Sequence, residues 1–185
     1  MDVFRAIERR RSVRKYKPSP IPEEDLKRIL ESARLAPSAH NWQPWRFVVA
    51  RNPEARRLLT EVSEKFIADA GCIVAALADP GARVMSGPLA RPRSACVRRN
   101  AEWLKMDVMI AIEHMVLTAE SLGYGTCWIR TLEDDEVKRI LGIPPEMLVV
   151  ALLSIGVPDE EPSPRPRKAF DEIFYEEKFG KNMSA

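Results

Sequence analysis

The 185 residues suffice for one globular domain, and 45% of them are apolar, which is enough for a buried core. The 29 basic and 27 acidic side chains nearly cancel, so the net charge of +2 provides no global attraction to nucleic acid. Two histidines and three cysteines (Cys72, Cys96 and Cys127) without CxxC spacing argue against a metal site or a disulfide framework. Because Cys72 and Cys127 lie within apolar runs, we predict that they are buried free thiols.

No targeting or membrane segment is predicted. The chain opens MDVFRAIERRR, which lacks the apolar stretch of a secretory signal. The longest apolar runs are too short and too interrupted to cross a bilayer. We therefore expect a soluble, cytoplasmic protein with no membrane partner.

The chain begins with a predicted short helix over residues 2–10, which carries three apolar side chains on one side: Val3, Phe4 and Ile7. Three prolines then form an extended link. Pro22 is expected as the first residue of an amphipathic helix that runs through residue 36, because its fixed φ and the acidic residues after it suit a helix start. Pro37 ends that helix.

Two strands and a helix are predicted over the middle of the chain. Residues 46–50 and 72–78 are apolar enough to be strands, and the second is apolar on both faces, as a central strand should be. Between them, residues 54–69 have the spacing of an amphipathic helix. Residues 79–99 contain five arginines and no clear periodicity, which indicates a mobile, basic loop.

The second half begins with the most apolar predicted helix, over residues 103–122. Its polar stripe is narrow, so we expect it to be buried nearly all round, in part by a second subunit. Residues 125–129 and 147–156 predict strands, separated by a helix that Thr131 caps and Gly142 ends. The elements together predict an α+β or α/β protein with about four core strands. The proline-rich tail ends in FDEIFYEEKF, which suits a short helix or an arm.

The common catalytic and phosphate-binding motifs are missing from the sequence. There is no GxGxxG, no GxxxxGK[ST] and no GxSxG, and neither histidine has a triad-like context. Paired carboxylates occur at helix starts and in the tail, where favourable contact with the helix dipole or with water explains them. Three polar stretches remain as candidate sites.

The first candidate site is RRSVR at residues 10–14. Arg10, Ser12 and Arg14 alternate, so in an extended segment their side chains lie on one side and could receive a phosphate monoester. The alternative is a solvated basic helix end. Arg165 and Arg167, in PRPRK, have the same spacing, but taken alone they could equally be a surface charge run.

The remaining candidate is APSAHNWQPWRF at residues 36–47. Ser38, Asn41 and Gln43 supply donors and acceptors that the two prolines can hold in fixed directions. The alternative is a well-packed loop whose two tryptophans anchor it in the core. Local sequence does not separate these two interpretations.

Taken together, four stretches resemble the FMN-dependent nitroreductases. That family has an amino-terminal R-R-S-x-R-x-[YF], then A-P-S-x-x-N-x-Q-P-W-x-F, a buried helix followed by L-G-[LY]-G-T-C-W, and a carboxy-terminal P-x-x-R. The corresponding stretches here are RRSVRKY (10–16), APSAHNWQPWRF (36–47), SLGYGTCWI (121–129) and PRPRK (164–168). Their order and spacing extend over nearly the whole chain, and the second stretch is the most specific.

The resemblance implies a role for each motif. The amino-terminal motif would hold the phosphate and ribityl of FMN through Arg10, Arg11, Ser12 and Arg14, and Arg14 would also stabilise the reduced flavin electrostatically. The second motif would line the flavin ring from the other subunit, through Pro37, Ser38, Ala39 and Asn41. The third would run beside flavin N5, through Tyr124, Gly125 and Thr126. Arg165 and Arg167 would return to the phosphate.

The resemblance also implies the fold and the assembly. We expect a single nitroreductase-like FMN-binding domain over residues 1–185, with a variable loop at 79–99 and a carboxy-terminal extension at 158–185. Its central, mostly antiparallel sheet would be flanked by helices in an α+β fold, and two chains would form an intertwined homodimer with shared flavin sites. At Glu113–His114, members often carry a glutamine–asparagine pair, so a contact made there would differ.

The implied activity is ping-pong hydride transfer from NAD(P)H, through flavin N5, to a small electron-poor acceptor such as a nitroaromatic or a quinone. No side-chain general base is required. Three alternatives remain: a specialised member of the same fold, such as a reductive dehalogenase, a flavin-fragmenting enzyme or a heterocycle dehydrogenase; a non-enzymatic flavin-binding protein; and a binder of nucleic acid or an acidic partner through the arginines at 83–99. The last is disfavoured by the low net charge and by the absence of aromatic residues among those arginines.

Overall fold

A four-stranded antiparallel sheet forms the centre of the computed structural model, which describes residues 1–82 and 101–183. Its strand order is β1-β2-β4-β3, and the bounds are β1 Trp45–Ala50, β2 Cys72–Ala78, β3 Gly125–Ile129 and β4 Leu148–Gly156. The sequence predicted β2 and β3 with the observed bounds, and the other two strands to within one residue. The α+β class with an antiparallel sheet is therefore confirmed.

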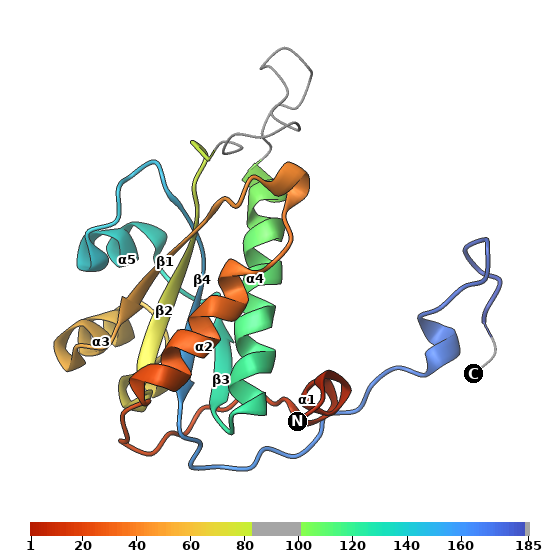
Figure 1. Cartoon of the computed structure of the whole chain (residues 1–185), viewed down its shortest axis with the longest axis horizontal. Coiled ribbons are helices and arrows are strands. Elements are labelled where there is room, and N and C mark those ends of the chain that lie inside the picture. Colours follow the sequence, from red (N-terminus) through yellow and green to blue (C-terminus); the bar gives the residue numbers. More distant parts are fainter. Residues whose placement is uncertain (83–100, 184–185) are drawn as a thin grey trace.

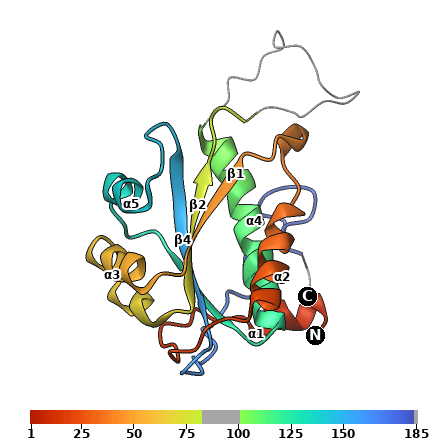
Figure 2. The same ribbon diagram turned by 60° about the vertical axis from the view of Figure 1, so that its left-hand side comes forward.

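Helices cover both faces of this sheet (Figures 1 and 2). On one face lie α2 (Glu23–Arg34) and the long α4 (Ala101–Ser121), and on the other lie α3 (Pro53–Glu61) and α5 (Asp134–Leu141). The short α1 (Val3–Arg9) packs against α4. Two apolar cores result, one on each side of the sheet.

The central strand β2 shows why the sheet needs helices on both faces. All seven of its residues are buried. Val74 and Ala76 belong to the core under α2 and α4, whereas Ile73 and Leu77 belong to the core under α3 and α5. Because side chains alternate along a strand, an unbroken apolar run requires an apolar layer on each side.

Helix ends differ from the sequence prediction in two places. Pro22 has an extended backbone (φ −53°, ψ 142°) and lies just before α2 instead of being its first residue, because the pyrrolidine ring fixes φ but leaves ψ free. Glu133, not Thr131, is the residue that precedes α5. At the other end of α5, Gly142 takes a left-handed conformation (φ 64°) and ends the helix as predicted.

The helix predicted over residues 54–69 is broken in two. α3 ends at Glu61, and a separate 3₁₀ helix, η2, covers Lys65–Asp69. Between them the Val62 carbonyl accepts a hydrogen bond from the Glu133 backbone N–H at 3.1 Å, and the Ser63 hydroxyl donates to the Leu59 carbonyl. The apolar periodicity of the sequence continues beyond Glu61, but the hydrogen bond with Glu133 ends α3 there.

One side of the molecule leaves apolar residues uncovered. The long helix α4 is not buried all round within one chain, because four large side chains in its first half are 41–57% exposed: Trp103, Met106, Met109 and Ile110. On α1, the apolar side is also exposed, through Val3, Phe4 and Ile7. A second subunit is one way to cover these residues, as the sequence predicted for α4.

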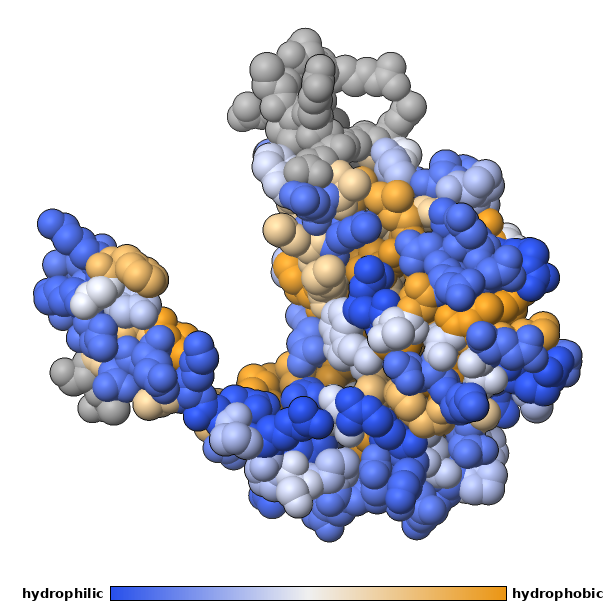
Figure 3. Space-filling view, turned by 180° about the vertical axis from the view of Figure 1, so that it is seen from behind, coloured by the Kyte–Doolittle hydropathy of each residue, from blue (hydrophilic) through white to orange (hydrophobic). Residues whose placement is uncertain are grey.

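The carboxy-terminal segment forms an arm. It pairs with the amino-terminal segment at Tyr16 and Pro158, and then extends away from the body through a short 3₁₀ helix, η3 (Phe170–Glu172). Figures 1 and 3 show the arm standing clear of the body, and it carries exposed apolar side chains: Phe170, Ile173, Phe174, Phe179 and Met183.

Two sequence predictions fall partly or wholly outside the described residues. The predicted basic loop at 79–99 is described only as far as Ala82, and Cys96 is not described. Cys72 and Cys127 are buried free thiols, as predicted. Within the described ranges, no helix has the length and apolar character that a membrane span requires.

Candidate functional site

The segment RRSVR runs beside the start of β3. Ser12 forms a parallel bridge with Thr126, and the Val13 backbone N–H donates to the Thr126 carbonyl at 2.9 Å. The segment is therefore extended, as the alternation of Arg10, Ser12 and Arg14 predicted. This pairing fixes the segment against the edge strand of the sheet.

Arg10, Ser12 and Arg14 lie close enough to the buried thiol of Cys127 to influence its pKa. Burial raises the pKa of Cys127, and the carboxylate of Glu64 adds to the rise. The Arg14 and Arg10 guanidiniums and the Ser12 side chain act in the opposite direction. The Arg14 guanidinium also lies 6.0 Å from the centroid of the Phe66 ring.

The two guanidiniums of this cluster have no carboxylate partner within residues 1–82 and 101–183. Arg9, by contrast, pairs with Glu120, and Arg51 pairs with Glu23. Two unneutralised cations and a hydroxyl on one short segment form a receptor that suits a phosphate. The structure therefore brings together three of the predicted site residues.

Arg11 points elsewhere. Its guanidinium donates to the carbonyls of Glu8 (2.7 Å) and Arg10 (2.9 Å), and it lines a cleft of about 700 Å³. Tyr124 and Gly125 line the same cleft. The side chain of Arg11 is thus directed away from those of the other predicted residues of the amino-terminal motif. Its role in binding a cofactor stays a prediction.

The exit of the carboxy-terminal arm is fastened to the arginine segment. A carboxylate oxygen of Glu160 accepts hydrogen bonds from the backbone N–H groups of Arg14 and Lys15, and the Asp159 N–H donates to the Lys15 carbonyl at 2.9 Å. Nothing in the local sequence distinguishes Glu160 from a solvated tail carboxylate, so this role is not predictable from the sequence. Its contact is with residues almost 150 positions away.

Arg165 and Arg167 lie beyond this point, on the arm. Both are exposed, and the Arg167 guanidinium donates to the Arg165 carbonyl at 3.2 Å. Because the arm extends from the body, one chain does not place these residues in the cluster with Arg10 and Arg14 (Figure 1). Their predicted return to the phosphate stays a prediction, and it requires the arm of another chain or a different arm position.

The loop at residues 36–44 is held in an unusual backbone conformation. Three of its non-glycine residues have positive φ: His40 (51°), Asn41 (56°) and Gln43 (50°). Each such residue costs of the order of 1–3 kcal/mol and persists only where its surroundings hold it in place. Strained backbone of this kind concentrates at functional sites, which favours the interpretation of this stretch as a site over that of a packing loop.

Several contacts fix the loop. The Gln43 N–H donates to the Ser38 hydroxyl at 2.9 Å, and the Ala39 N–H donates to a carboxylate oxygen of Asp107 at 3.1 Å. Trp45 is buried at the end of the loop, as a packing residue should be. Three of the four residues predicted to line the flavin ring are exposed, and Ser38 is half-buried: Pro37, Ser38, Ala39 and Asn41.

The third motif has a packing function within the chain. The Tyr124 hydroxyl donates to Asp25 at 2.7 Å, and burial together with this hydrogen bond raises the pKa of Tyr124 to about 12. A Cβ on Gly125 would lie 2.8 Å from Val13, so the glycine makes room for that side chain. Thr126 is buried. The predicted contacts of Tyr124, Gly125 and Thr126 with a flavin stay predictions.

The loop and the arginine cluster lie at opposite ends of α4 (Figures 1 and 2). The loop is bonded to Asp107, whereas Arg9, next to the cluster, pairs with Glu120 at 3.5 Å. Thirteen residues of helix separate these two contact points, which corresponds to ~20 Å. The two predicted halves of the site are thus well apart within one chain.

The departure at Glu113–His114 has a structural consequence. His114 Nδ1 lies 3.1 Å from the Ser32 carbonyl, and the contact joins α4 to α2. Glu113 and His114 are both half-buried. In this chain His114 therefore contributes to the packing of the two helices.

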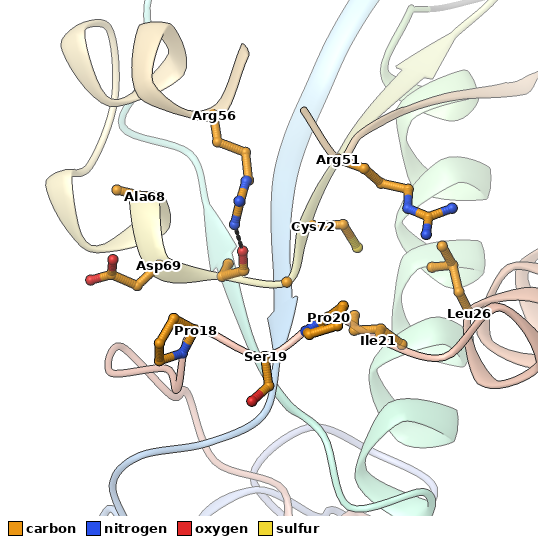
Figure 4. A pocket seen from close by; sticks show the side chains of 12 residues that line it. Pro18, Ser19, Pro20, Ile21, Leu26, Arg51, Arg56, Ala68, Asp69 and Cys72 are labelled. Carbon is orange, nitrogen blue, oxygen red and sulfur yellow. Dashed lines mark hydrogen bonds between the residues drawn. The ribbon is translucent and has the colours of Figure 1, made fainter. Parts of the chain in front are cut away.

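A second cavity, of about 350 Å³, lies between the proline-rich link and the start of β2 (Figure 4). Arg56 donates there to the Ala70 carbonyl, and Arg51 is paired with Glu23. Burial raises the pKa of Cys72 to about 12, so its thiol stays protonated at neutral pH and is not a nucleophile. None of the predicted site residues lines this cavity.

Comparison with known proteins agrees with the motifs. A "NADH dehydrogenase" of Thermus thermophilus is 30% identical, in an alignment that covers 94% of this chain and 95% of that protein. A nitroreductase family protein from Clostridium novyi is 30% identical with a TM-score of 0.75 and covers 98% of this chain and 97% of its own. An FMN-dependent nitroreductase from Clostridium difficile is 27% identical with a TM-score of 0.76, and the match covers 94% of this chain and 98% of that protein.

The match to a protein family covers most of the chain. Residues 7–157 fit the Nitroreductase family, a range that contains all of the sheet, the strained loop and the arginine cluster. The remaining segment is mainly the arm. This chain is a member of the Nitroreductase family.

Proposed function

We propose that this protein is an FMN-dependent oxidoreductase that takes electrons from NAD(P)H and passes them to a small electron-poor acceptor, such as a nitroaromatic or a quinone. The observation that carries the proposal is the cluster of Arg10, Ser12 and Arg14, an unneutralised phosphate receptor, in a chain of this family. Relatives named as an NADH dehydrogenase and an FMN-dependent nitroreductase support the choice of both nucleotides.

The residues present fit the phosphate of FMN. Two guanidiniums supply paired donors for phosphate oxygens, and the Ser12 hydroxyl supplies a further one. Ordinary surface arginines of this chain, such as Arg57 and Arg139, are instead satisfied by neighbouring carboxylates. Arg10 and Arg14 therefore have hydrogen-bonding capacity to spare.

The strained loop fits the flavin ring. A planar ring needs a surface at a fixed height and angle, and the hydrogen bonds of Ser38 and Ala39 hold the loop in one conformation. Pro37, Ala39 and Asn41 are the exposed residues that would contact the ring. A rigid surface lowers the ordering cost of binding.

When bound, FMN would supply the redox chemistry, namely acceptance of two electrons from the nicotinamide and their release to the acceptor in alternating half-reactions. The protein would contribute positioning and charge. A guanidinium such as that of Arg14, about 4 Å from a developing negative charge, contributes of the order of 4 kcal/mol at an effective dielectric constant of 20, before desolvation costs.

The site needs two chains. In a two-fold dimer with antiparallel α4 helices, the loop of one chain would lie near the arginine cluster of the other, which removes the separation of ~20 Å seen within one chain. The same arrangement would cover the exposed apolar residues of the first half of α4 with α1 of the partner. Obligate interfaces of this kind bury roughly 2,000–5,000 Å².

Purification without added cofactor tests the proposal. We expect a yellow protein whose visible absorbance is bleached by anaerobic titration with NADH or NADPH and restored by a quinone or a nitroaromatic. A colourless protein that FMN does not reconstitute would overturn the proposal. Bound FMN that NAD(P)H reduces no faster than free flavin would favour the flavin-binding alternative.

Sedimentation velocity tests the assembly. We expect a dimer that carries two FMN molecules, and we expect an isolated monomer neither to fold stably nor to retain flavin. A folded monomer with FMN bound would contradict the shared site. Measuring the flavin content of the same sample separates the two tests: a monomer with FMN contradicts only the shared site, whereas a dimer without FMN contradicts only the cofactor.

A further inference from the structure

Asp107 is a buried charge in the middle of an apolar helix. It lies in the first half of α4, 6% exposed, between buried and exposed apolar residues. One carboxylate oxygen, Oδ1, accepts the hydrogen bond from the Ala39 N–H, and the other, Oδ2, is buried without a partner among the described residues. In the sequence, the only signal of this residue is that it is a lone aspartate in the mostly apolar stretch WLKMDVMIAI.

A carboxylate in this position is costly. Removing an ionised group from water is unfavourable unless hydrogen bonds and charges replace its hydration. Leu104, Val108 and Ala111, its neighbours on α4, are buried apolar residues that would pack well around an apolar side chain. The packing of the helix therefore gives no reason for a charge here. Among the described residues, the contact that the carboxylate makes outside the helix is the hydrogen bond from Ala39.

That contact anchors the strained loop to α4. Ala39 immediately precedes His40 and Asn41, the first two residues with positive φ. Two other hydrogen bonds of this turn, to the Ser38 hydroxyl and between Gln43 and Asn41, lie within the loop itself. The Asp107 bond instead joins the loop to the rigid helix α4, 68 residues away in sequence.

We infer that Asp107 is a positioning residue: its carboxylate fixes the height of the loop 38–43 against α4 and so sets the surface that faces the flavin ring. The inference rests on the proposed function for the identity of the ring. Asp107 does not touch the cofactor or the substrate in this account. It acts through the backbone of Ala39.

Amide hydrogen exchange measured by mass spectrometry tests this directly, on full-length protein with and without FMN. Replacing Asp107 by Ala should speed exchange in the peptide that contains residues 38–43 by ~10-fold or more, the effect of losing one charge-assisted hydrogen bond. Exchange in β2 should stay within about 2-fold of the wild-type rate. In FMN-loaded protein, the same variant should also change the visible circular dichroism of the flavin.

Two further variants make the result specific. Val108 is the next residue on α4, and its side chain is fully buried and apolar. Val108→Ala should therefore lower the stability of the core without selectively speeding amide exchange in the loop. Asp107→Asn keeps an oxygen that can accept from Ala39, and should return loop exchange to within about 3-fold of wild type.

The outcomes separate this inference from the proposed function. If the wild-type protein binds no FMN, the proposed function fails, yet the exchange experiment still reports on the anchor. If the loop of Asp107→Ala exchanges like that of wild type or of Val108→Ala, the inference is overturned. Unfolding of both Asp107 variants would also overturn it, since the carboxylate would then support the whole body and not the loop.

Discussion

The two faces of the sheet differ in how completely a single chain covers them. Under α3 and α5, large apolar residues such as Leu59 and Ile67 are fully buried, and Arg57 on the outside is paired with carboxylates. On the side of α1 and α4, by contrast, the large apolar residues Trp103 and Met106 are exposed. Figure 2 shows the two sides edge-on.

This difference suggests that one side of the sheet mainly stabilises the fold, whereas the other side mainly serves binding. The α3 and α5 side buries its own large apolar residues, so it contributes stability and needs no partner to cover it. The α1 and α4 side leaves apolar surface and the strained loop uncovered, and a cofactor and a second chain would complete these. Substitutions on the two sides should therefore have different consequences.

The largest expected effect comes from charging the open face. Met106→Glu combined with Ile110→Glu would place two carboxylates in the proposed interface, where burial of each costs several kcal/mol. We expect loss of the dimer in sedimentation velocity, together with loss of bound FMN. Asp135→Lys, which changes an exposed charge on α5 at the other face, is the control and should leave both unchanged. A dimeric, yellow double variant would contradict the assembly.

Removal of the unpaired cations should come next. Arg10→Ala with Arg14→Ala removes charge-assisted hydrogen bonds worth about 1.5–3 kcal/mol each, so FMN affinity should fall by about 100-fold or more. Far-ultraviolet circular dichroism should show that the fold survives. The matched control, Arg57→Ala with Arg139→Ala, removes two exposed, ion-paired arginines and should not change the flavin content. Equal flavin content in both double variants would mean that the phosphate binds elsewhere.

On the closed face, a core truncation should affect stability alone. Leu59→Ala, at a fully buried position, should lower the free energy of unfolding by about 2–5 kcal/mol. The resulting drop in Tm should be the same at low and high protein concentration. By comparison, Trp103→Ala on the open face should weaken the dimer in sedimentation velocity, because it acts on association, whereas Leu59→Ala should leave dimerisation at low temperature unchanged. Equal effects of both variants on dimerisation would remove the distinction between the faces.

The smallest expected effect is a pH dependence on the α2 and α4 side. Since the pKa of Tyr124 is raised to about 12 in the folded chain, the stabilisation from its bond to Asp25 is present below pH 10 and is lost as the pH rises from 10 toward 12. Tyr124→Phe should cost about 1 kcal/mol near neutral pH, and the difference from wild type should shrink above pH 10. Tyr175→Phe, on the arm, serves as the control in the same urea titrations. A constant difference across this range would show that the bond does not titrate.

Local sequence correctly predicted those strands and helix ends that depend only on residues close by in the chain. β2 was located because an unbroken apolar run suits a central strand, and the end of α5 because a glycine takes positive φ there. The break after α3 was missed, since the carbonyl of Val62 is bonded to Glu133, more than 70 residues later. Periodicity contains no information about such a contact.

The same distinction between local sequence and packing applies to the candidate site. The extended backbone that the alternation of Arg10, Ser12 and Arg14 requires is observed, but Arg11 turns toward its own helix end to donate to the Glu8 and Arg10 carbonyls. The resemblance named the loop residues, yet it gave no reason for their rigidity. That reason is the set of hydrogen bonds within the loop and from Asp107, which only the packed structure reveals.

By itself, the sequence determined the strands, most of the helices and the family, because these depend on short-range spacing and on motifs that local geometry preserves. Tertiary structure alone decided which motifs meet. Within one chain it placed the strained loop and the arginine cluster at opposite ends of α4, since a helix is rigid and its length separates whatever binds its two ends. Distances between segments remote in sequence are set by packing, and no local pattern encodes them.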